Sequence, residues 1–149
     1  MKNNLLLILL GLTAVSCAPK DQAKPEPLLG TWKLLTGMTI NGRDTALTDY
    51  TVGQEMIKII TPTHFAFMRH DLKGGKDSTA VYVAGGGRAQ INGNIYTEYL
   101  DYLNYREWEG GVFELGYTVK GDTLITKGVE KVEEAGVDQV NVETYIRVK

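Results

Sequence analysis

The sequence predicts an all-β protein, an up-and-down antiparallel barrel of about eight strands. Apolar and polar residues alternate with a period of two along most of the chain, which is the pattern of strands that have two different faces. Short turn signals rich in Gly, Asn and Pro separate these runs, and almost no segment has apolar residues at helical spacing. An open sandwich of two sheets has the same periodicity, so it stays as the alternative architecture.

The predicted strands follow one another with short connections. They cover residues 31–38, 55–61, 64–70, 80–84, 88–91, 95–103, 112–119, 123–127 and 139–148. Asn92-Gly93-Asn94 is the strongest hairpin signal, because tight two-residue turns need positive φ angles that Asn and Gly tolerate. Gly85-Gly86-Gly87 predicts a bend or bulge, since no helix follows to make it a phosphate-binding loop. Asp44–Tyr50 is expected to form a short helical turn over an opening of the barrel.

The first sixteen residues have the plan of a signal peptide. Lys2 precedes the apolar run Leu5–Leu12, which is shorter than the roughly 20 apolar residues that cross a bilayer. Ala14-Val15-Ser16-Cys17 resembles the lipobox of bacterial lipoproteins, whose cysteine is acylated with palmitate-type chains after cleavage. That resemblance implies a lipidated Cys17, which anchors the protein in the bilayer of the bacterial cell envelope. We expect the outer membrane, facing the periplasm or the cell surface; an ordinary secreted protein cut nearby is the alternative.

Residues 17–27 are expected to form a flexible tether behind the lipidated cysteine. This stretch holds Pro19, Pro25 and Pro27, mixed charges and no large apolar residue, so it cannot bury enough surface to fold. Residues 28–149 are one domain's worth of chain. The predicted organisation is therefore a signal peptide over 1–16, a tether over 17–27 and a barrel over 28–149.

Leu28-Leu29-Gly30-Thr31-Trp32 and the terminal Tyr145-Ile146-Arg147 carry a resemblance to the lipocalins. The first has the Gly-x-Trp of their first strand, and the second is similar to their last strand. Further segments resemble small lipocalin-like lipoproteins of Bacteroidetes-type bacteria; they are Lys58–Thr61, Thr63–Phe65, Gly85–Arg88, Gly93–Glu98 and Gly121–Leu124. The resemblance implies a ligand-binding barrel whose base is closed by Gly30, Trp32 and Arg147, the arginine packing across the tryptophan.

Several function classes have no support in the sequence. The chain has 16 basic and 18 acidic residues, without the basic surface of a nucleic-acid binder. His64 and His70 lie too far apart on one predicted strand to share a metal, and there is no Cys/His cluster. No nucleotide-binding loop or nucleophile motif occurs. We therefore expect no metal, no cofactor and no enzymatic activity.

The candidate ligand site centres on the predicted strand Ile95–Leu103, because neither of its faces is wholly apolar. The hypothesis places six side chains around a cavity: His64, Arg88, Tyr96, Glu98, Tyr102 and Tyr117. Two alternatives remain open. The tyrosines and Glu98 would be surface groups, or Glu98 would pair with Arg88 in a buried polar network that binds nothing.

Three functions are compatible with these residues. The first is a non-catalytic, membrane-anchored binder of a small hydrophobic or amphipathic ligand. The second is a protein-binding envelope module, an inhibitor or accessory subunit with a filled barrel core, which would use Tyr105–Trp108 as an exposed patch. The third is an enzyme with Glu98 or His64 as general base. A barrel serves all three, so the fold alone does not decide among them.

Overall fold

The computed structural model describes residues 26–149. The predicted signal peptide, Cys17 and the tether up to residue 25 lie outside the described residues. The strands are β1 Gly30–Asn41, β2 Asp44–Asp49, β3 Gln54–Ile60, β4 His64–Asp71, β5 Tyr82–Asn92, β6 Ile95–Leu103, β7 Val112–Lys120, β8 Thr123–Val132 and β9 Val137–Arg147. A single 3-10 turn, η1, covers Arg106–Trp108. No helix among these residues is long and apolar enough to cross a bilayer.

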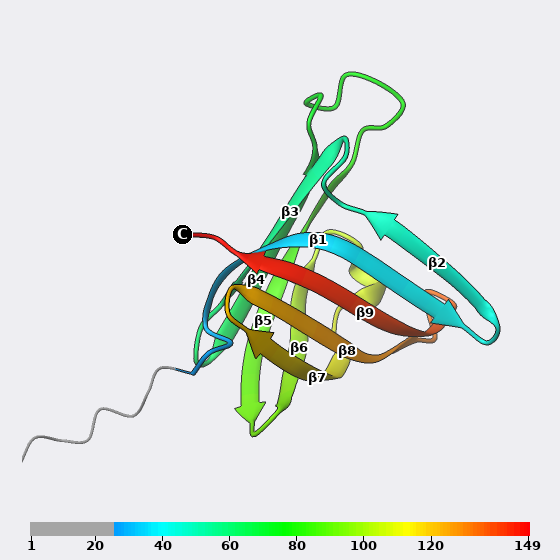
Figure 1. Ribbon diagram of the computed structural model, residues 1–149. Helices are drawn as coiled ribbons and strands as arrows, with labels where there is room; N and C mark the ends of the chain where they lie inside the picture. The colour runs from blue at the N-terminus through cyan, green and yellow to red at the C-terminus, as the bar shows by residue number, and fades with distance from the viewer. Residues whose placement is uncertain (1–25) are drawn as a thin grey trace, which may run out of the picture.

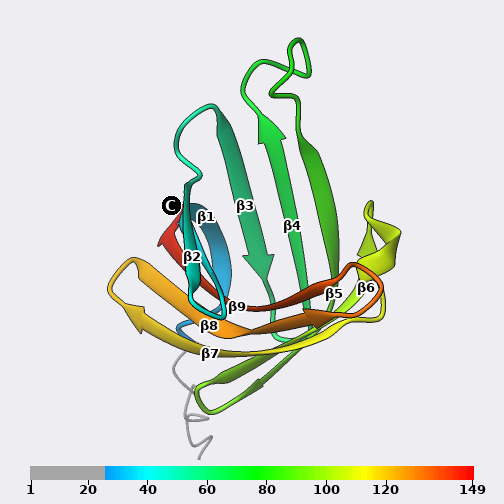
Figure 2. The same cartoon turned by 90° about the vertical axis from the view of Figure 1, so that its right-hand side faces the viewer.

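The strands form one antiparallel sheet that closes on itself. Their order is β2-β1-β3-β4-β5-β6-β7-β8-β9, and β1 also pairs with β9. Strand β1 and strands β3 to β9 therefore make an eight-stranded barrel, with β2 as an extra strand outside the ring (Figure 1). Figure 2 shows β3, β4 and β5 side by side as one wall, crossed by β7, β8 and β9. The predicted closed barrel is confirmed, and the open sandwich is excluded.

Strand β1 is long enough to take two partners along one edge. Gly30–Lys33 pairs with β3, whereas Thr36–Asn41 pairs with β2, and β9 occupies the other edge. The expected helical turn over Asp44–Tyr50 is wrong, because β3 leaves the second half of this edge free. Asp44–Asp49 satisfies those backbone groups as a strand, and its side chains are all exposed.

The base of the barrel is closed by Trp32 and the chain segment that precedes it. Trp32 is fully buried and donates from Nε1 to the Leu28 carbonyl at 2.8 Å. The Arg147 guanidinium lies 4.0 Å from the Trp32 ring centroid and donates to the carbonyls of Leu29 (2.8 Å) and Pro27 (2.6 Å). The pair implied by the resemblance is thus in contact. A Cβ at Gly30, whose φ is +132°, would lie 2.7 Å from Arg147 Nη1.

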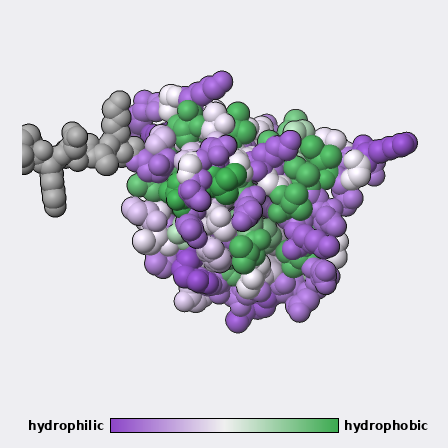
Figure 3. All heavy atoms as spheres, turned by 90° about the horizontal axis from the view of Figure 1, so that it is seen from below, coloured by the Kyte–Doolittle hydropathy of each residue, from purple (hydrophilic) through white to green (hydrophobic). Residues whose placement is uncertain are grey.

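The apolar core extends from this base toward the opposite end of the barrel, where some of its side chains border a cavity. It is formed by inward-facing side chains of almost every strand, which alternate with outward-facing ones. The largest fully buried members are Trp32, Tyr96, Tyr145, Leu28, Leu34, Ile60 and Leu124. On the outer face seen from below, apolar side chains form small groups separated by polar ones (Figure 3).

The three consecutive glycines lie inside a continuous strand. The sequence predicts strands at 80–84 and 88–91 with a bend or bulge between them; β5 runs unbroken from Tyr82 to Asn92, and the irregularity is a bulge in its pairing with β6. The register with β6 shifts between Gly86 and Gly87, because Asp101 is an extra residue on the opposite strand. A Cβ at Gly87 would clash with the Tyr99 carbonyl oxygen, and one at Gly85 would lie 2.6 Å from that of Tyr102. The glycines therefore let neighbouring backbones approach closely at the bulge.

Gly87→Ala should destabilise the protein by about 1–3 kcal/mol, because the added methyl overpacks the bulge. Gly116→Ala is the matched control, since a Cβ there meets only the Lys127 carbonyl oxygen at 3.7 Å. Urea denaturation measures both free energies of unfolding. Equal stability of the two variants would contradict this role for Gly87.

Candidate functional site

A cavity of about 530 Å³ occupies the half of the barrel away from Trp32. Its walls come from the inward faces of the strands, and its rim from the residues that follow β2 and β6. The apolar wall consists of Met56, Phe67, Val83, Leu100, Leu103, Phe113 and Leu115. Tyr50, Tyr105 and Trp108 add aromatic rings near the rim. A set of charged and amide side chains faces them: Lys58, Arg69, Glu98, Glu107, Glu130, Gln139, Asn141 and Glu143.

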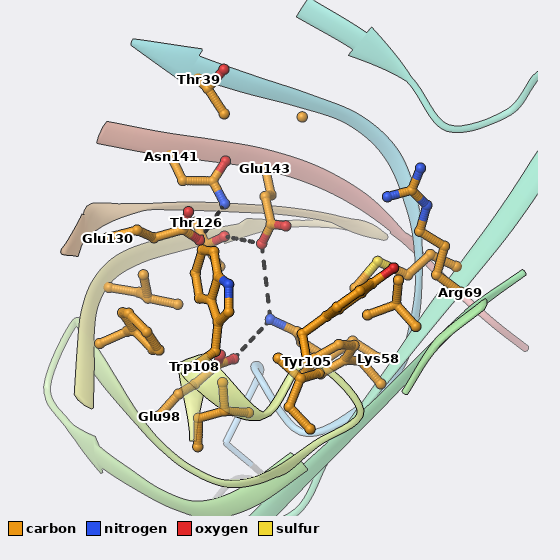
Figure 4. Close-up of a pocket in the computed structure, with 18 of the residues that line it drawn as sticks. Thr39, Lys58, Arg69, Glu98, Tyr105, Trp108, Thr126, Glu130, Asn141 and Glu143 are labelled. Atoms are coloured by element: carbon orange, nitrogen blue, oxygen red, sulfur yellow. Dashed lines mark hydrogen bonds and ion pairs between the residues drawn. The ribbon is translucent and has the colours of Figure 1, made fainter. Parts of the chain in front are cut away.

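Lys58 is the buried cation at the floor of this cavity. It lies on β3 between Met56 and Ile60 and is only 4% exposed. Its Nζ is 2.8 Å from Glu98 Oε1 and 3.9 Å from Glu143 Oε2 (Figure 4). Burial alone would lower the pKa of Lys58, but the negative charges of Glu98 and Glu143 outweigh burial and raise it. Lys58 therefore keeps its proton and is a fixed positive charge, not a free amine nucleophile.

Glu143 on β9 connects this ion pair to the core. Its Oε2 accepts a hydrogen bond from the Tyr145 hydroxyl at 2.5 Å, and Thr126 Oγ1 lies 3.5 Å away. Burial raises the pKa of Tyr145 well above its usual value, and the charge of Glu143 adds to the effect. Tyr145 therefore stays protonated and acts as a hydrogen-bond donor to the carboxylate.

Glu130 on β8 is a second acidic group in the wall, held by amides. Its two oxygens accept hydrogen bonds from Asn141 Nδ2 at 2.8 Å and Gln139 Nε2 at 3.0 Å. Burial raises the pKa of the Glu130 carboxyl, and these two hydrogen bonds oppose the shift only in part. No lysine or arginine in residues 26–149 lies within 4.0 Å of it, so its charge has no close counter-ion there.

The rim residue Trp108 is held in place by a fixed loop. Glu109 Oε1 accepts the Leu103 backbone N–H at 2.9 Å, and Glu109 Oε2 pairs with Arg106 at 2.7 Å. The Trp108 ring lies 6.3 Å from that of Phe113 and lines the cavity. The segment expected to form an exposed patch, Tyr105–Trp108, borders the cavity, where Tyr105 is about half exposed and Trp108 is partly buried.

Of the six predicted ligand-binding residues, only Glu98 lines the cavity. Tyr96 is on the same face of β6 but lies fully buried below it, and its hydroxyl has no hydrogen-bond partner within the described part of the chain. Burial raises the pKa of Tyr96, with a further contribution from the charge of Glu98. The structure therefore brings these two together at the cavity floor.

His64, Arg88 and Tyr102 point away from the cavity, which corrects the expectation. Tyr102 is 72% exposed, because the bulge at Asp101 reverses the alternation of β6 after Leu100. Arg88 lies on the exposed face of β5 and pairs with Asp101 at 3.0 Å. It does not pair with Glu98, so the alternative network is wrong as well. His64 is exposed on the outer face of β4.

Tyr117 faces inward but lies at the closed end. Its hydroxyl is 2.7 Å from Glu26 Oε1 and 2.9 Å from the Gly93 carbonyl oxygen. Burial raises the pKa of Tyr117 to about 12. Tyr117 and Arg147 together attach Glu26 and Pro27 to the barrel, so the last two residues of the predicted tether belong to the folded part.

The sequence hypothesis missed the residues that make the cavity polar. Glu143 and Asn141 belong to the polar half of the alternation in β9, and this half faces inward. The apolar half, with Val140 and Val142, faces outward. Alternation marks two faces but does not say which one is inside, and the usual assumption of an apolar interior fails here.

Two further observations bear on the site. No group of three or more His, Cys, Asp or Glu residues within 26–149 is placed to hold a metal ion. The sequence matches no known protein family and no curated protein.

Tyr96→Phe should leave stability unchanged or raise it by about 1 kcal/mol, because it removes a buried hydroxyl that makes no hydrogen bond within residues 26–149. Tyr145→Phe is the matched variant and should cost about 1.5–3 kcal/mol, since it removes a hydrogen bond to the Glu143 carboxylate. Chemical denaturation of both variants checks the difference. If Tyr96→Phe proved the more damaging of the two, the Tyr96 hydroxyl would have a partner that this assignment lacks.

Proposed function

We propose that this protein is a membrane-anchored lipoprotein whose lipocalin-like barrel binds a small amphipathic molecule without changing it chemically. The observation that carries the proposal is the cavity of about 530 Å³ at one end of a closed barrel. Small-molecule sites in proteins occupy about 300–1,000 Å³ and combine apolar walls with a few placed polar groups. Both features are present here.

The contacts of the ionisable groups favour binding over catalysis. Glu98, one of the two general bases considered, is paired with the Lys58 ammonium at 2.8 Å. His64, the other, is exposed on the outside of the barrel. A general base must reach the proton of a bound substrate, and neither group is placed to do so freely.

The membrane anchor is supported by the lipobox-like Ala14-Val15-Ser16-Cys17. We propose that this anchor attaches the barrel to the outer membrane of the bacterial cell envelope. Two or three acyl chains on one cysteine give stable attachment.

Metabolic labelling with a palmitate analogue tests the anchor. Wild-type protein should carry the label and stay with the membrane fraction, whereas Cys17→Ala should lose both. Label that persists in the Cys17→Ala variant, or no label in wild type, would refute it.

A protein-binding module is the second candidate, and one observation favours it. Ile40, Val140 and Val129 lie opposite one another on the outer faces of the neighbouring strands β1, β9 and β8, and Val129 is 56% exposed. Such a row of apolar residues is a natural contact surface for another protein. The filled core expected for this alternative is not what the cavity indicates.

Native mass spectrometry of residues 18–149, which include every strand of the barrel, tests ligand binding. We expect a co-purified small molecule, or uptake of the fluorescent probe 1-aminoanthracene. Val83→Trp should abolish uptake by filling the cavity, whereas the outward-facing Val129→Trp is the matched control and should retain it. Absence of any bound molecule, together with no uptake, would leave the protein-binding candidate.

A further inference from the structure

Deep in the cavity, acidic side chains outnumber basic ones. Glu98, Glu130 and Glu143 line it together, and Lys58 is the one cation within 4.0 Å of any of them in the described chain. Lys58 Nζ lies 2.8 Å from Glu98 Oε1, so its positive charge mainly compensates the negative charge of Glu98. Glu130 and Glu143 accept hydrogen bonds from neutral side chains, but no cation other than Lys58 lies within 4.0 Å of either in residues 26–149.

Arg69 does not supply the missing positive charge. Its Nε donates to Gln54 Oε1 at 2.7 Å, and its guanidinium stacks 5.0 Å from the ring centroid of Tyr50. Figure 4 shows Arg69 on the opposite side of the cavity from Glu130 and Asn141. Arg69 therefore borders the rim near β2, and the wall formed by β8 and β9 stays negative.

A partly buried carboxylate without a close counter-ion favours cationic ligands over anionic ones. A cationic group that comes within hydrogen-bond distance recovers the interaction that burial removed from the carboxylate. An anionic group meets repulsion in a site of low dielectric, where charges interact strongly. The raised pKa of Glu130 agrees with this wall being short of positive charge.

The remaining walls suit the other half of an amphipathic molecule. Trp108 and Phe113 lie with their rings 6.3 Å apart, and Leu100 and Leu103 extend the apolar surface along β6. The charged wall and the apolar wall belong to the same cavity.

We propose that the ligand is a small amphipathic amine, bound with its protonated nitrogen toward Glu130 and Glu143 and its apolar body against Trp108, Phe113 and Leu103. The inference rests on the proposed function, since it names the class of ligand for the same cavity. It reverses the choice that Lys58 alone would suggest, because Lys58 is already paired with Glu98, and Arg69 lies on the opposite side of the cavity from Glu130.

Three probes of equal chain length test the inference by isothermal titration calorimetry on residues 18–149 at neutral pH. They are octylamine, octanol and octanoate. We expect octylamine to bind about ten-fold or more tightly than octanol, as loss of a desolvated charge pair has effects of this size. Octanoate should bind more weakly than octanol.

The variant Glu130→Gln tests whether the acidic wall causes the preference for octylamine. The variant should bring the affinity for octylamine down to about that of octanol and leave octanol unchanged. Glu114→Gln, on the exposed outer face of β7, is the matched control and should alter neither. Because the comparison of the three probes uses the wild-type protein, it decides the matter even if Glu130→Gln does not fold.

The outcomes separate this inference from the proposed function. If octanol binds but octylamine binds no tighter, or if octanoate binds best, the amine preference is overturned while the binding barrel stands. If octylamine is preferred but Glu130→Gln folds and leaves that preference intact, Glu130 is not its source and the assignment fails. If octylamine does not bind at all, the amine inference is overturned; the proposed function fails with it only if no molecule co-purifies and 1-aminoanthracene is not taken up either.

Discussion

Closure of the sheet through the β1–β9 ladder is the constraint on which the rest of the structure depends. The ladder runs from Trp32 opposite Arg147 to Ile40 opposite Val140. Once these edges are paired, every barrel strand has one face enclosed and one face outside. The closure also brings Arg147 over Trp32, although the two residues lie at opposite ends of the domain sequence. Both the sealed base and the enclosed cavity follow from this pairing.

Burying polar side chains inside the barrel costs free energy unless they form ion pairs or hydrogen bonds. The charged side chains of the interior form such contacts with one another. Lys58, Glu98, Glu143 and Tyr145 form a connected set in which the two protonated groups face the two carboxylates. The hydrogen bonds of this set fix the positions of its members, although one ammonium leaves the two carboxylates with a net negative charge. The cavity lies beside this set, so its polar wall is preorganised before any ligand enters. That rigidity favours binding, because little side-chain ordering remains to be done.

The sequence predicts much of the fold but little of the site. Alternation and turn residues such as Asn92-Gly93 define the strands locally, and closure follows from their number. The expected position of Tyr102 is wrong because one extra residue, Asp101, reverses the face of β6 after Leu100. The three glycines mark an irregularity on β5, but they do not show at which residue of β6 the alternation reverses. The partner of Glu98 is 40 residues away on β3, so no local pattern could identify Lys58. The inward side of β9 is hidden as well, since Val140 and Val142 make its outer face apolar.

The division of β1 between two partners has a consequence for the shape of the opening. Strand β2 pairs only with β1, and the first residues of β3 pair only with β4, so a seam separates β2 from β3 near the rim (Figure 2). Thr48 of β2 and Met56 of β3 both line the cavity on either side of that seam. Strand β2 is exposed along its whole length, so its side chains add little burial to this part of the rim. The opening is therefore bounded on this side by one strand that is held only by β1, whereas the rest of the wall is a continuous ladder of paired strands.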